Sequence, residues 1–148
     1  MSIYRAIASG LIGACALTLI HQSARQITSD APRMDVLGMR AIRQSLTHMD
    51  LPAPTGATLY RTTLAGDLVS NAMYYSLVGA GQPAGALWRG ALLGGLAGLG
   101  SVVLPGPLGL GQAPTARTNA TARMAVAWYT IGGIVAALAY QMLAPKPR

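Results

Sequence analysis

The sequence predicts an all-α protein: a four-helix transmembrane bundle with an amphipathic interfacial helix between the first and second membrane-spanning helices. Four apolar stretches each approach the ~20 residues that a helix needs to cross a bilayer. Hydrophobic residues make up 52% of the chain and charged residues only 10%, whereas soluble domains usually carry ~25% charged residues. We expect one integral membrane domain over residues 1–148.

The first apolar stretch predicts a transmembrane helix over about residues 3–24. Two alternatives are a cleaved signal peptide, with Arg5 in its basic region, and a lipoprotein signal ending at Cys15. The apolar run continues past Cys15 as far as Ile20. That continuation favours an uncleaved membrane helix.

A polar connector, residues 21–59, contains a second predicted helix over about residues 31–49. The segment Asp30-Ala31-Pro32 is a helix-start signal, with a capping acid and a proline in the first turn. Arg40 and Arg43 fall on one face of this helix and apolar side chains on the other. A helix of this kind favours a position along the membrane surface; the alternative is a cytoplasmic helix packed on loop residues.

The second and third predicted spans, about residues 60–80 and 84–104, form a helical hairpin. The second carries Asp67, a carboxylate embedded in an apolar helix, where an ionisable group is costly. At about 100° per residue, polar side chains share an arc with it, and Arg123, at the start of the fourth span, is the cation expected to pair with it. The candidate polar intramembrane site comprises Asp67, Ser70, Asn71, Tyr74 and Arg123. This site is either a buried pair that fixes helix register or an ion- or proton-coupled site.

The third span carries Gly90, Gly94 and Gly98 at intervals of four residues. Such a stripe lets another backbone approach closely, which is how membrane helices associate. A second connector, residues 105–121, begins with prolines and glycines that cannot continue a helix. The fourth span follows at about residues 121–143, and its side of small residues is expected to meet the glycine stripe.

The distribution of cations predicts the orientation, since cytoplasmic loops are enriched in Lys and Arg. The connectors 21–59 and 105–121 with their flanks hold Arg25, Arg33, Arg40, Arg43, Arg61, Arg117 and Arg123, and the termini and hairpin turn hold Arg5, Arg89, Lys146 and Arg148. The larger group indicates cytoplasmic connectors in a bacterial plasma membrane. Arg89 is expected to extend to lipid headgroups.

The net charge of +7 indicates anionic lipid headgroups as partners rather than nucleic acid, because the cations lie mostly between apolar segments. The sequence has no catalytic, metal-binding or cofactor pattern, so we expect neither an enzyme nor a cofactor or metal site. The preferred function is helix–helix association, as an accessory or structural subunit or as a homo-oligomer. The alternative is a small ion- or proton-coupled transporter or channel that uses the polar face around Asp67.

Overall fold

The computed structural model describes residues 2–144, and every regular element in that part of the chain is a helix. The all-α prediction is therefore confirmed. Its elements in chain order are α1 (Ile3–Ile27), α2 (Met34–His48), α3 (Gly56–Ser76), the 3₁₀ turns η1 (Leu77–Gly79) and η2 (Pro83–Gly85), α4 (Ala86–Val103) and α5 (Asn119–Met142).

Three helices are long and apolar enough to cross a membrane: α1, α4 extended back to Pro83, and α5. The second predicted span, about residues 60–80, corresponds to α3, which is not among them. Its length of 21 residues suffices, but Arg61, Asp67 and Asn71 and several hydroxyl residues lower its hydropathy. The finer description as four spans is taken up below as a proposal.

The boundaries of two helices differ from the sequence expectation in ways that local chemistry explains. Helix α2 begins at Met34, with Arg33 at its N-cap and no side-chain cap. The predicted helix start at Asp30-Ala31-Pro32 is therefore wrong. The acidic residue in the first turn is Asp35. Its negative charge stabilises the positive end of the helix dipole. Helix α3 begins at Gly56, whose φ of 55° suits glycine.

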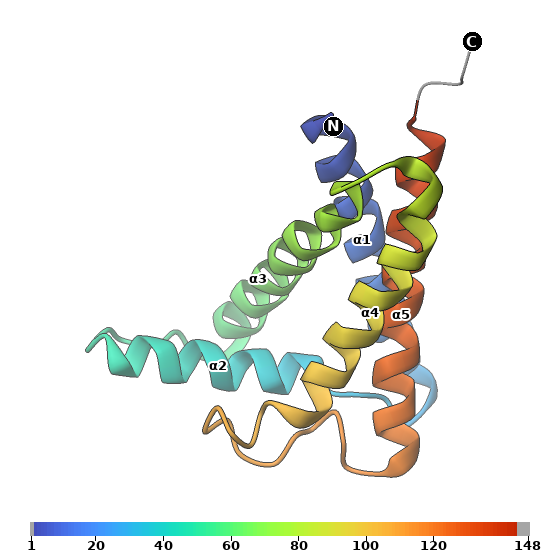
Figure 1. Ribbon diagram of the computed structural model, residues 1–148. Helices are drawn as coiled ribbons and strands as arrows, with labels where there is room; N and C mark the ends of the chain where they lie inside the picture. The colour runs from blue at the N-terminus through green and yellow to red at the C-terminus, as the bar shows by residue number, and fades with distance from the viewer. Residues whose placement is uncertain (1, 145–148) are drawn as a thin grey trace.

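Helices α4 and α5 lie side by side and antiparallel, α1 packs on α5, and α3 packs mainly on α1 (Figure 1). Helix α3 leans away from α4, and its contacts with α4 and α5 lie near its C-terminal end. Helix α2 runs across the lower end of the bundle in this view. The start of α1 and the end of α5 lie at the opposite end.

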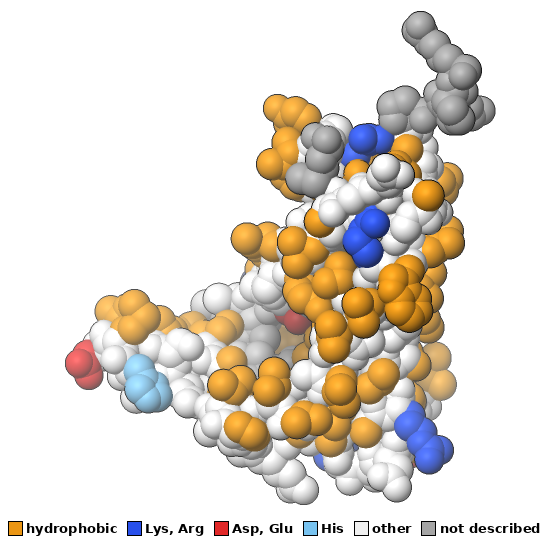
Figure 2. All heavy atoms as spheres, in the orientation of Figure 1, with side chains coloured by type: hydrophobic (Ala, Val, Ile, Leu, Met, Phe, Trp, Pro, Cys, Tyr) orange, Lys and Arg blue, Asp and Glu red, His pale blue; other side chains and the backbone are white. Residues whose placement is uncertain are grey.

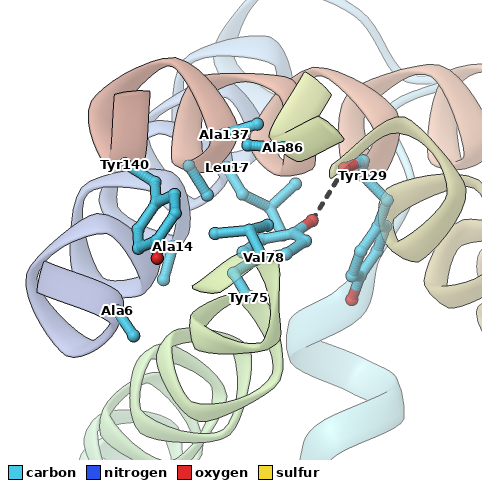
Figure 3. Packing of buried hydrophobic residues seen from close by; sticks show 10 residues of the cluster. Ala6, Ala14, Leu17, Tyr75, Val78, Ala86, Tyr129, Ala137 and Tyr140 are labelled. Carbon is cyan, nitrogen blue, oxygen red and sulfur yellow. Dashed lines mark hydrogen bonds between the residues drawn. The ribbon is translucent and has the colours of Figure 1, made fainter. Parts of the chain in front are cut away.

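The buried core lies where α1, α3, α4 and α5 meet, around Leu17, Tyr75, Val78 and Tyr140 (Figure 3). Small residues, among them Ala136, fill the remaining space. This core is narrow, because close helix contacts leave little room for large side chains. Large apolar residues instead occupy outward faces.

The connector between α4 and α5 packs under α2. Arg40 donates to the carbonyl oxygens of Leu110 and Gln112, at 3.1 and 2.9 Å, and the Gln44 amide donates to Leu108. Part of the polar face of α2 is thus occupied by loop backbone. The bonds hold α2 and this connector together at the same end of the molecule.

Candidate functional site

Asp67 lies on α3, where its side chain is largely covered. Its Oδ1 accepts a hydrogen bond from the Nδ2 of Asn71 at 3.0 Å, and the same nitrogen donates to the Asp67 carbonyl at 2.9 Å. Ser70 donates to that carbonyl as well, at 3.1 Å. These three members of the predicted site therefore form one local cluster on a single helical turn.

The predicted ion pair between Asp67 and Arg123 is wrong. Arg123 is exposed on α5, and both ion pairs within residues 2–144 involve Asp35. Helix α5 turns Thr121 and Ala125 inward. Arg123 is about 200° from each of them around the helix, so the packing of α5 directs it outward.

Tyr74, the remaining member of the predicted site, has a different partner. Its hydroxyl donates to the carbonyl oxygen of Leu93 on α4 at 3.0 Å. The neighbouring Tyr75 is fully buried and donates to the carbonyl oxygen of Tyr129 on α5 at 2.7 Å (Figure 3). The two tyrosines join α3 to the α4–α5 pair rather than forming a relay with Asp67.

A small cavity of about 20 Å³ lies between α1, α2 and α3, and Asp67 is on its wall. The wall also includes His21 and Thr63, which are only 5% and 4% exposed. The Nε2 of His21 and the Oγ1 atoms of Thr63 and Thr18 are buried with no hydrogen-bond partner in the described part of the chain. The surface of the cavity is otherwise mainly apolar, and its volume has room for about one water molecule.

Sequence reasoning missed the α1 side of this cavity. Thr18, His21, Gln22 and Arg25 line it, and their spacing of i, i+3, i+4 and i+7 places them on one helix face. That spacing was the available signal.

An ion-pair cluster closes the cavity on the side of α2. Asp35 accepts from Arg33 through both carboxylate oxygens, at 2.9 and 2.8 Å, and lies 3.3 Å from Arg25. Burial of the Asp35 carboxyl opposes ionisation, but the Arg33 hydrogen bonds and the two guanidinium charges hold its pKa below the ordinary value. Arg25 also donates to the Tyr60 hydroxyl, at 3.4 Å.

The predicted packing residues Gly90, Gly94 and Gly98 are buried against α5. A Cβ atom at Gly94 would meet the carbonyl oxygen of Tyr129 and the Cα of Thr130. The glycine stripe thus faces mainly the backbone of α5, with the Cβ atoms of Ala137 and Tyr129 beside it. Arg89 donates to the carbonyl oxygens of Val78 in η1 and of Gln82 in the turn that follows. Its contact with lipid headgroups stays a prediction.

Comparison of this chain with protein-family models, with curated proteins and with solved structures finds no match. Its function is therefore inferred from its residues and their arrangement.

Proposed function

We propose that this chain is an integral membrane protein in which α1, α3, α4 and α5 cross the bilayer and α2 lies along its surface. Large apolar side chains on the outward faces support this: Ile7, Leu11 and Leu19 on α1, and Leu92, Leu96 and Leu99 on α4, are all exposed. Figure 2 displays this apolar covering on one face of the molecule. In lipid such residues face acyl chains at no cost.

The inclusion of α3 as a fourth span rests on how its polar residues are covered. Thr63 and Asn71 are buried and Asp67 is largely covered, and α1 and α2 supply much of that cover. Polar side chains within a membrane should face protein or water. We further propose that the connectors lie in the cytoplasm of a bacterial cell, by the distribution of arginines.

Within the membrane, the proposed function is helix association, as a homo-oligomer or as a subunit of a larger complex. One observation carries this proposal: α3 has an open side. Thr58, Thr62, Gly66 and Ser70 recur every fourth residue and are all exposed, and a Cβ atom on Gly66 would meet nothing within 4 Å. The molecular surface is also hollowed beside α3 (Figure 2). Small and hydroxyl residues at this spacing are typical of faces that another membrane helix contacts.

The test is Gly66→Leu, examined by native mass spectrometry of the full chain in mild detergent. Because the site is open, leucine should leave the protomer folded but should keep a partner helix at a distance. We expect loss of the oligomer or of a co-purifying chain, with unchanged thermal unfolding. The control Leu96→Phe adds bulk to an outward face of α4 and should leave assembly unchanged. A Gly66→Leu chain that assembles like the parent, or a parent chain that is monomeric and alone, would refute the proposal.

The second candidate is an ion- or proton-coupled transporter or channel. It is favoured by one observation: Asp67 lacks a cationic partner in the described chain and lies on the wall of a small cavity together with His21 and Thr63. Asp67→Asn should abolish pH-dependent flux in reconstituted vesicles if this function is correct. If the chain acts only by association, vesicles with Asp67 and with Asn at position 67 should behave alike.

A further inference from the structure

An open pocket of about 460 Å³ lies outside the Asp67 cavity, where the end of α1, the loop before α2 and the connector before α5 meet. We call it the arginine pocket, because three arginines line it. Its wall includes Arg25, Arg33 and Arg117, with Gln22, Gln26 and Thr28. Its volume lies within the range of ligand-binding pockets, roughly 300 to 1,000 Å³.

The arginine pocket carries an excess of positive charge. Asp35 is the carboxylate bonded to Arg25 and Arg33, and one negative charge leaves two of the three positive charges uncompensated. Asp30, in the adjacent loop, is exposed and is not among the lining residues. This excess positive charge favours the binding of an anion in the pocket.

Hydrogen-bond donors remain free to bind that anion. Arg117 donates to the carbonyl oxygens of Ser29 and Ala31 through Nη2 alone, so its Nε and Nη1 have no partner among residues 2–144. The contacts to Ser29 and Ala31 fix the guanidinium at the pocket. Both forked edges of a guanidinium include Nη2, so the free Nε and Nη1 do not form a fork. Each can donate one charge-assisted hydrogen bond to a phosphate oxygen.

The position of the arginine pocket points to a lipid rather than to a soluble anion. It lies at the end of the bundle that α2 crosses (Figure 1), which is the headgroup level in the proposed membrane placement. On α1, Ile12 and Leu19 are exposed. They precede Gln26 at intervals of seven residues, which places all three on the same helix face. This apolar stripe leads from the pocket toward the bilayer interior, as acyl chains would.

We propose that the arginine pocket binds the phosphate of an anionic phospholipid. The bond would be made by Arg117, and Arg25 and Arg33, which also line the pocket, would contribute positive charge. Basic pockets at the ends of membrane helices recognise phospholipid headgroups in this way. The inference rests on the proposed membrane placement but not on the association through α3.

The experiment is native mass spectrometry of the full chain in detergent, with phosphatidylglycerol or phosphatidylcholine of equal acyl chains added. We expect one phosphatidylglycerol to be retained preferentially. Arg117→Gln should weaken its retention roughly tenfold, as the loss of a charge-assisted bond predicts. Arg61→Gln removes the same charge at the same end of the molecule but outside the pocket, and should retain the lipid.

A second pair of variants tests the same proposal independently, in case Arg117→Gln does not fold. Gln26 is exposed on the pocket wall, so Gln26→Glu adds a repelling charge without removing a contact, and should also lose the lipid. Ser45→Glu, on the exposed surface of α2, should not. Equal retention of phosphatidylcholine, equal losses in the pocket and control variants, or displacement of the lipid by inorganic phosphate would overturn the proposal. Solubility of the chain without detergent would instead refute the membrane placement.

Discussion

Gly90 on α4 and Gly133 on α5 lie face to face, so close that a Cβ atom on either would collide with the backbone of the other. Further along the same contact, Gly94 meets Tyr129 and Thr130, and Gly98 meets Val126. At these glycines the two backbones come close enough to make direct dispersion contacts. Packing of this kind replaces the hydrophobic drive that is lacking between helices in lipid.

The first prediction compares two adjacent glycines of α4. Gly94→Ala should destabilise the protein by roughly 1–3 kcal/mol, because overpacking forces the backbones apart. At Gly95 the nearest atom outside the helix is Thr130 Oγ1, at 3.8 Å, which leaves room for a methyl group. Gly95→Ala should therefore be neutral or stabilising by about 0.5–1 kcal/mol. Thermal unfolding in detergent measures both, and similar destabilisation by the two variants would contradict the close contact.

The glycine contact illustrates what a sequence pattern can indicate. Gly90, Gly94 and Gly98 recur at the helical period, and that period fixes which side of α4 is smooth without knowledge of its neighbour. The pairing of Asp67 with Arg123 depended instead on how α3 and α5 are rotated relative to each other. That rotation is set by tertiary packing, and no period within one helix encodes it.

The arginine pocket and the contact of His21 with α5 could not be predicted from the sequence, for a similar reason. Arg25, Arg33 and Arg117 come from three segments of the chain, and the loop backbone around Ser29 brings them together. His21 packs edge-on against Trp128 and Tyr129 of α5, with ring centroids 5.3 and 5.7 Å away. A contact that spans more than 100 residues of sequence leaves no local signature.

The second prediction concerns the hydroxyl of Tyr75. Tyr75→Phe removes its bond to the Tyr129 carbonyl and should destabilise the protein by about 0.5–1.5 kcal/mol. Tyr74→Phe removes a similar but less buried bond to Leu93 and should cost less. Unfolding of both variants and of the double variant in detergent would measure these costs. If Tyr75→Phe unfolds like the parent chain, the Tyr75 hydroxyl does not contribute to holding α3 on α5.

The third prediction is a pH dependence from Asp35. Its pKa is lower in the folded protein than the ordinary 3.8, because the bonds and charges of Arg33 and Arg25 outweigh burial. The stability that it contributes is therefore fully present above pH ~4–5 and is lost as the pH falls through the lowered folded pKa. The difference in thermal stability between the parent and Asp35→Asn should shrink on acidification below pH ~4.

The control for that experiment is Asp30→Asn, in the loop just before α2, where the side chain is exposed. Its difference from the parent should be small at every pH. A difference for Asp35→Asn that stays constant between neutral and acidic pH would show that the two arginines do not stabilise the carboxylate.

The fourth prediction concerns whether Asp67 forms a structural ion pair with Arg123 or is an unpaired carboxylate. Asparagine can accept the same bond from Asn71 and removes a charge that is costly to bury, so Asp67→Asn should leave thermal stability unchanged or raise it. Arg123 is exposed, and Arg123→Gln should have little effect. In a double-mutant cycle, the coupling between the two positions should stay below about 0.5 kcal/mol. A larger favourable coupling would restore the pair that the sequence suggested, and with it a purely structural role for Asp67.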